Sequence, residues 1–152
     1  HGDVMELEGI IEAPLGRHPK ERKRISTHTR KARSAVTQWM VIQRFKGFAL
    51  LEVIPKTGRT HQIRAHLSSR GYPIVGDPEY RRGKWIERIK DPQIREGIRT
   101  LKRQALHSER LAFIHPRSDK RMEFSAPLPE DMAGIIQFLS QHAQSPEAMG
   151  TS

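Results

Sequence analysis

Ten consecutive residues, Thr57 to His66, hold the densest group of side chains that could take part in chemistry. They read TGRTHQIRAH, with two arginines, two histidines and a glutamine directly after an apolar stretch. Gly58 would let the backbone approach a ligand closely, and the free N–H groups of a helix start could bind phosphate. The segment matches neither a P-loop nor a dinucleotide-binding fingerprint. It therefore predicts a polar site beside a core strand, without a nucleotide cofactor.

The same residues give little support for a metal site or a serine nucleophile. His61 and His66 are five positions apart, so they would not share one face of a helix. The chain contains no cysteine and no HExxH motif, and we expect no bound metal. No GxSxG motif supports a Ser/His/Asp triad, although the residue types for one are present.

Arg64 admits two interpretations. It could be a surface arginine paired with a nearby acid, or a guanidinium at the floor of a cleft that orients a carboxylate or a flipped base. Arginine suits the second task because its planar fork binds a carboxylate through two hydrogen bonds and stays charged. The residues alone leave both interpretations open.

The charge of the chain indicates a polyanionic partner. Lys and Arg number 27 against 17 Asp and Glu, which gives a net charge of +10. Such a balance favours nucleic acid over a membrane surface. Residues 17–33 concentrate this charge, and they are predicted to form a loop or hairpin arm that binds phosphates, with a simple solvated loop as the alternative. The candidate RNA contacts are Arg17, Lys20, Arg22, Lys23, Arg24, Arg59, His61 and Gln62.

A helix and a hairpin would position the polar site. Residues 35–45 and 48–54 are rich in β-branched and aromatic side chains, and the short connection between them predicts a β-hairpin. Thr60 is the expected N-cap of a helix that runs to about Arg70. Ile63 and Leu67 would form the buried stripe of this helix, so that Arg64 projects sideways into a cleft.

The remaining elements predict an α+β fold with a mostly antiparallel mixed sheet and flanking helices. Further strands are expected at 4–11, 104–114 and 122–125, partly helical structure at 80–103, and a last helix from Glu130 or Asp131 to about His142. We expect one domain over 1–142 and a frayed tail over 143–152. No run reaches the ~20 apolar residues that a membrane span needs, and the absence of cysteine fits a reducing cytoplasm.

The motifs together resemble the signature of the RluA-type pseudouridine synthases. The resemblance rests on PKTGRTHQIRAH at 55–66, followed by GYPIVGDPEY at 71–80. Shorter matches occur in the same order at GRHP (16–19), QALH (104–107), FIHP (113–116) and APLPEDM (126–132). One departure is Arg81, which stands where the family commonly has glycine.

The resemblance implies an enzyme that isomerises uridine to pseudouridine in RNA without a cofactor, with ribosomal RNA favoured over transfer RNA. In this family the uracil is flipped out, an aspartate of an HRLD-type motif is the nucleophile, and a tyrosine packs against the base. Arg64 would form the ion pair that keeps this aspartate ionised and oriented. The alternative is a basic RNA-binding module without catalytic activity.

No HRLD-type motif occurs in the chain, and both that motif and the family's tyrosine would precede His1. We therefore expect the C-terminal part of a synthase catalytic domain, with Arg64 present and the nucleophile outside this chain. Its partners would be RNA and the rest of the parent catalytic domain. Asp77 is expected to make turn hydrogen bonds and not to replace the nucleophile.

Overall fold

A three-stranded antiparallel sheet forms the centre of the structure, a computed structural model that describes residues 1–21, 24–29, 31–80 and 85–142. The strands lie in the order β1 (Glu8–Glu12), β4 (Val36–Phe45) and β5 (Phe48–Pro55). The predicted hairpin is confirmed, because β4 and β5 pair from Phe45–Phe48 to Thr37–Pro55. Gly47 closes its turn with a φ of 77°, a conformation that suits glycine.

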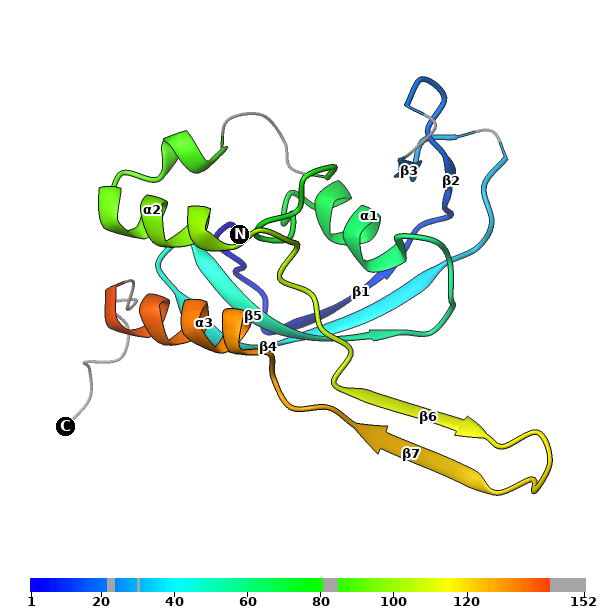
Figure 1. Cartoon of the computed structure of the whole chain (residues 1–152). Helices are drawn as coiled ribbons and strands as arrows, with labels where there is room; N and C mark the ends of the chain where they lie inside the picture. Colours follow the sequence, from blue (N-terminus) through cyan, green and yellow to red (C-terminus); the bar gives the residue numbers. More distant parts are fainter. Residues whose placement is uncertain (22–23, 30, 81–84, 143–152) are drawn as a thin grey trace.

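The two faces of this sheet differ in what covers them. On the inner face, Ile11 packs with Leu67 of α1 (Gln62–Ser69) and with Ile74, joined by Trp39, Leu51 and Val53 of the sheet. On the outer face, Ile10, Met40 and Ile54 remain exposed. Figure 1 shows α1 and α2 on one side of the sheet. The sheet therefore buries only the face that carries α1.

A second apolar cluster lies where the β4–β5 hairpin meets the later helices. The helices are η1 (Trp85–Arg88), α2 (Pro92–Thr100) and α3 (Glu130–His142). The cluster consists of Phe45, Phe48, Trp85, Ile94, Ile98, Ile135 and Leu139. Asp91 caps α2 by accepting hydrogen bonds from the N–H groups of Gln93 and Ile94. The predicted last helix, with acids in its first turn, is confirmed.

Two hairpins extend from the body. The first, the basic arm, pairs β2 (Gly16–Arg17) with β3 (Ile25–Ser26), and a bridge between Leu15 and Arg33 closes its base. The second pairs β6 (Arg110–Ile114) with β7 (Arg121–Ser125) and projects away from the sheet (Figure 1). The predicted hairpin arm is thus confirmed, while Arg22, Lys23 and Arg30 lie outside the described residues.

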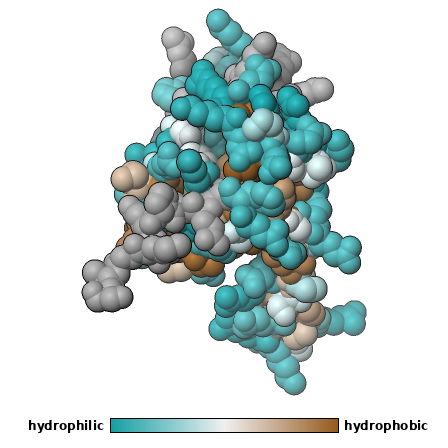
Figure 2. Space-filling model, turned by 90° about the vertical axis from the view of Figure 1, so that its left-hand side faces the viewer, coloured by the Kyte–Doolittle hydropathy of each residue, from teal (hydrophilic) through white to brown (hydrophobic). Residues whose placement is uncertain are grey.

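The β6–β7 hairpin exposes large apolar side chains. Leu111, Phe113 and Phe124 lie between 41% and 57% exposed, and the two phenylalanine rings stack with centroids 5.8 Å apart. By contrast, Figure 2 shows the side of the molecule formed by α2 and α3 as mostly hydrophilic, with hydrophobic residues in small groups. The described residues thus leave two apolar surfaces open, the β6–β7 hairpin and the outer sheet face.

Three predicted boundaries differ from the structure. β1 begins at Glu8 and not at Val4, and β6 covers only 110–114 of the predicted 104–114. The helix begins at Gln62, so Thr60 is not its N-cap; His61 takes that position with a left-handed φ of 51° and no side-chain cap bond. The cause is Gln62, whose Oε1 accepts the N–H of Arg59 and closes the preceding turn. The remaining elements confirm an α+β fold with antiparallel pairing.

The tail at 143–152 lies outside the described residues, so the predicted domain boundary remains a prediction. No helix in the described ranges is both long enough and apolar enough to cross a membrane.

We predict that truncating two isoleucines, one in the core and one on the surface, lowers stability by different amounts. Ile98 is 1% exposed and Ile54 is 45% exposed. Ile98→Ala should lower the free energy of unfolding by about 2–5 kcal/mol, because it leaves a cavity, and Ile54→Ala by less than about 1 kcal/mol. Urea unfolding of both variants measures this. Equal losses would contradict the assignment of the core.

Candidate functional site

Gln62 holds the start of α1 against the sheet. Its Nε2 donates to the carbonyl of Val36 and to Oγ1 of Thr37, at 2.9 and 3.0 Å. Its Oε1 accepts from Oγ1 of Thr57 and from the N–H of Arg59. Both ends of the amide are therefore satisfied inside the protein, and the residue is 4% exposed. This burial contradicts the predicted RNA contact of Gln62 and gives the side chain a structural role.

His66 joins the same network from the next turn of α1. Its Nε2 lies 2.9 Å from the carbonyl of Ala13, which can only accept, so Nε2 carries the proton. Nδ1 then accepts from Oγ1 of Thr37 at 2.8 Å. Burial lowers the pKa of His66 below its ordinary value, although the bond to Ala13 opposes this. The neutral imidazole is thus part of the fold.

Arg64, on another side of α1, forms a buried ion pair with Asp77. Its Nε donates to Oδ2 at 2.7 Å and its Nη2 to Oδ1 at 2.8 Å. The Asp77 side chain is fully buried, and that of Arg64 is 11% exposed. Hydrogen bonding to Asp77 raises the pKa of Arg64 above its ordinary value. The pair fixes the guanidinium in one orientation.

Asp77 is itself held by the turn that follows α1. Its Oδ1 accepts the N–H groups of Glu79 and Tyr80, at 2.9 and 3.0 Å, as predicted for a turn aspartate. Burial alone would raise the pKa of Asp77, but the hydrogen bonds from Arg64, Tyr80 and Glu79 hold it below its ordinary value. Gly76 is required before it, because φ is 75° and a Cβ would lie 2.1 Å from the carbonyl oxygen of Arg103.

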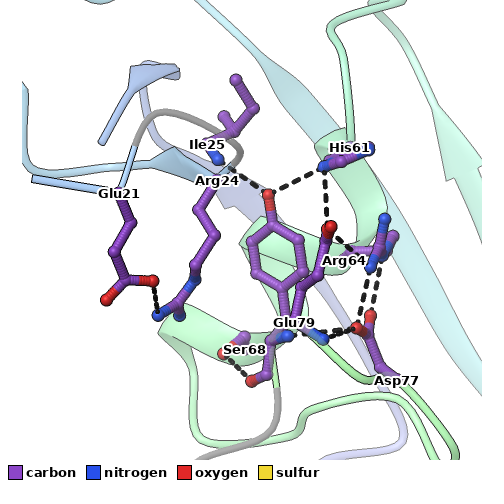
Figure 3. Close-up of polar contacts among 9 residues, drawn as sticks. Glu21, Arg24, Ile25, His61, Arg64, Ser68, Asp77 and Glu79 are labelled. Atoms are coloured by element: carbon purple, nitrogen blue, oxygen red, sulfur yellow. Dashed lines mark hydrogen bonds and ion pairs between the residues drawn. The ribbon is translucent and has the colours of Figure 1, made fainter. Parts of the chain in front are cut away.

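A second carboxylate reaches Arg64 from the solvent side. Oε2 of Glu79 accepts from Nη2 at 3.1 Å, and the Glu79 side chain is 35% exposed. His61 lies next to it, with Nδ1 3.7 Å from the same oxygen. Figure 3 shows Arg64, Asp77, Glu79 and His61 converging. Arg64 is therefore bound on its inner edge by a buried aspartate and on its outer edge by a partly exposed glutamate.

The predicted RNA contacts fall into three groups. Arg17, Lys20 and Arg24 lie on the basic arm, with Arg24 paired to Glu21 at 2.9 Å. Arg59 is exposed, and its Nε donates to the carbonyl of Ser34. Arg22 and Lys23 lie outside the described residues. Of the described residues, Arg17, Lys20, Arg24, Arg59 and His61 therefore remain candidate RNA contacts.

The structure pairs Arg64 with nearby acids of this chain, as in the first of the two interpretations, although the arginine is buried and not on the surface. The sequence placed Asp77 in a turn but did not identify it as the partner of Arg64. The available signal was the GDPE segment at 76–79, a short loop after the helix, which returns two carboxylates to its side. Among the described residues, no group of three or more His, Cys, Asp or Glu side chains could hold a metal ion.

The chain is similar in sequence to RNA pseudouridine synthases. The family described as RNA pseudouridylate synthase matches residues 3–69. The chain is 42% identical over 142 residues to the RNA pseudouridine synthase YlyB of Bacillus subtilis, covering 93% of this chain and 42% of that protein. It is 40% identical over 133 residues to the ribosomal large subunit pseudouridine synthase D of Nitrosomonas europaea, covering 88% and 37%. The chain thus spans about two fifths of the length of these relatives.

A solved structure has the same fold. The human RNA pseudouridylate synthase domain containing 1 superposes with a TM-score of 0.62 at 22% identity, over 95% of this chain and 64% of that one. This likeness agrees with the α+β architecture described above.

We predict that replacing Asp77, the buried partner of Arg64, lowers the free energy of unfolding strongly and in a pH-dependent way. Asp77→Asn should lower the free energy of unfolding at pH 7 by about 3 kcal/mol, because it removes one partner of a buried ion pair. The lowered pKa of Asp77 adds stability above the ordinary aspartate pKa, and this is lost as pH falls through the folded-state value. In urea titrations from pH 7 to pH 2, the free energies of unfolding of the wild type and of Asp77→Asn should therefore become similar at acid pH. Asp119→Asn, at an exposed turn, is the control and should change little.

We predict that His66 makes the stability of the protein depend on pH in a second, less acidic range. Its pKa in the folded protein is lower than the ordinary 6.5, so its stabilising effect is complete above pH 6.5 and is lost as pH falls toward the folded-state value. His66→Gln should be less stable at pH 7.5 yet lose less stability than the wild type between pH 7.5 and 5.5. Thermal melting measures both, with His28→Gln as the exposed control. A parallel decline of wild type and His66→Gln would refute this role.

Proposed function

Since the chain belongs to the RluA-type RNA pseudouridine synthases, we propose that its protein isomerises uridine to pseudouridine in RNA. Two features support an RNA substrate, namely the net charge of +10 and the basic arm. The names of several relatives refer to the large ribosomal subunit, which favours ribosomal RNA over transfer RNA. The same relatives favour a synthase over a basic RNA-binding module without activity.

The geometry of Arg64 is the observation that carries the proposal. Its inner edge is occupied by Asp77, and Glu79 shows that its outer edge can hold another carboxylate. Among the described residues, Nη1 of Arg64 makes no hydrogen bond. A nucleophilic aspartate that approached from the outer side would meet a guanidinium already in position. The positive charge would keep that carboxylate ionised and able to attack.

Asp77 does not fit the role of the nucleophile. Its side chain is fully buried, and both oxygens are occupied by Arg64 and by the N–H groups of the turn. An attacking carboxylate must reach a base that has been flipped out of its RNA. We therefore propose that the nucleophile comes from an HRLD-type segment outside this chain, and that Asp77 serves to hold Arg64.

The open apolar surfaces support a further polypeptide segment against this chain. An isolated two-stranded hairpin is marginally stable in water, and contiguous exposed apolar patches mark interaction sites. The β6–β7 hairpin and the outer sheet face both fit this description. We propose that the rest of the catalytic domain covers them and brings the nucleophile to Arg64.

RNA would reach the site across its basic surface. We assign phosphate contacts to the arm residues Arg17, Lys20, Arg22, Lys23 and Arg24, and further contacts to Arg59 and His61. His61 is partly exposed, and its Nδ1 lies 3.7 Å from Oε2 of Glu79, so it borders the outer edge of Arg64. We further propose that the protein acts in the cytoplasm, where ribosomal RNA would be its substrate.

Arg64 provides the decisive variant. In a protein that joins this chain to the HRLD-type segment, Arg64→Lys should lower the rate of pseudouridine formation by at least about 100-fold, because a point charge replaces a bidentate fork. The 152-residue chain alone should form no pseudouridine. Both are measured by digesting a ribosomal RNA substrate to nucleosides and separating pseudouridine from uridine by chromatography, because the two isomers have the same mass.

The matched control is Arg99→Lys, since Arg99 lies on an exposed face of α2 beside Glu96. It should retain full activity. RNA binding and the melting temperature of Arg64→Lys separate a lost chemical role from a lost fold. Near-normal turnover in Arg64→Lys, or turnover by the 152 residues alone, would disprove the assignment.

A further inference from the structure

Tyr80 touches both the basic arm and the buried ion pair. It follows the GDPE turn, and its side chain is 2% exposed. Its backbone N–H donates to Asp77, and its carbonyl accepts from Oγ of Ser68 on α1 at 2.9 Å. These two bonds fix Tyr80 relative to the elements that carry Arg64.

The hydroxyl of Tyr80 extends this connection to the arm. It accepts the N–H of Ile25, in strand β3, at 2.8 Å across 55 residues of sequence. It also lies 3.1 Å from Nδ1 of His61, to which it is free to donate its proton. The other hydrogen bonds of the arm's described residues, 16–21 and 24–29, stay within the arm. One phenol group therefore makes the polar link between arm and site.

The ring of Tyr80 makes the apolar part of the same link. It packs with Leu15 and Ala35 at the base of the arm, with Ala65 of α1, and with Ile25. The guanidinium carbons of Arg64 and Arg24 lie 4.7 and 5.4 Å from the ring centre, within the range of cation–π attraction. Figure 3 shows Arg24 and Ile25 of the arm near His61, the N-cap of α1, and Arg64 of α1.

We propose that Tyr80 is the positioning residue that fixes the basic arm relative to Arg64, so that both act on the same segment of RNA. The inference rests on the proposed function, because RNA is the ligand that both would share. The two-residue ladder of β2 and β3 lies within the arm, and the Leu15–Arg33 bridge holds its base, so the hydroxyl of Tyr80 makes the polar contact that orients the described part beyond the base. Without the hydroxyl, the N–H of Ile25 would lose its partner and the arm would lose its set position.

The test compares two tyrosines in the 152-residue chain. Tyr80→Phe removes the hydroxyl and keeps the ring, whereas Tyr72→Phe removes the only other phenol, which lies beside Gly2. Binding of a fluorescent RNA hairpin with a uridine-containing loop is measured by anisotropy over a range of salt concentrations. Amide exchange of Ile25 is followed by NMR.

Tyr80→Phe should weaken RNA binding by about fivefold to tenfold, as expected for one lost hydrogen bond. Its salt dependence should match the wild type because no charge changes, while Lys20→Gln should lower the slope by about 1. Exchange at Ile25 should accelerate in Tyr80→Phe alone. Tyr72→Phe should behave as the wild type in every measurement.

A second variant, Ile25→Pro, should weaken RNA binding as Tyr80→Phe does, and it keeps the proposal open to refutation if Tyr80→Phe proves unstable. Ile25→Pro removes the same hydrogen bond from the opposite side, since proline has no N–H. The two changes should then not add in RNA binding. Additive losses, or wild-type affinity in Tyr80→Phe, would overturn the role of Tyr80 and leave the proposed function standing. Failure of the wild-type chain to bind RNA would overturn both.

Discussion

The buried guanidinium of Arg64 is the constraint on which this region depends. A charge removed from water must be paired, and Asp77 supplies that pairing through two short hydrogen bonds. Asp77 can do so only because the turn after α1 presents it correctly, with Gly76 in a left-handed conformation and two backbone N–H groups on Oδ1. The ion pair thus joins the helix to the following loop.

The side chains of the motif TGRTHQIRAH point to two different sides of α1. Gln62 and His66 face the sheet and are satisfied by Thr37 and neighbouring backbone groups, so they fix the helix. His61 and Arg64 face Glu79 and Tyr80 and form the polar site. A chain segment rich in polar groups can therefore lie against a core strand. Gln62 and His66 stabilise the fold, and His61 and Arg64 form the polar site.

Sequence patterns predicted the hairpin β4–β5, helix α3, strands near β6 and β7, and a loop or hairpin for the basic arm, because each has a local signature of periodicity and turn residues. They failed where a particular side-chain hydrogen bond or a distant residue decides the structure. Thr60 was a reasonable cap, yet the side chain of Gln62 closes the turn and moves the helix start. Arg64 was singled out from the sequence, but its bond to Asp77 spans 13 residues and a glycine turn that no periodicity encodes. The burial of Gln62 likewise depends on β4, a strand 25 residues away.

The central claim is that Arg64, held by Asp77, keeps a second carboxylate ionised at its outer edge. It is tested most directly by the pKa of the HRLD-type aspartate, measured by carbon NMR in a protein that joins that segment to this chain. The account predicts a pKa below the ordinary ~3.9, rising by at least about 1 unit when Arg64 is changed to glutamine. An aspartate whose pKa is the same with and without Arg64 would contradict it.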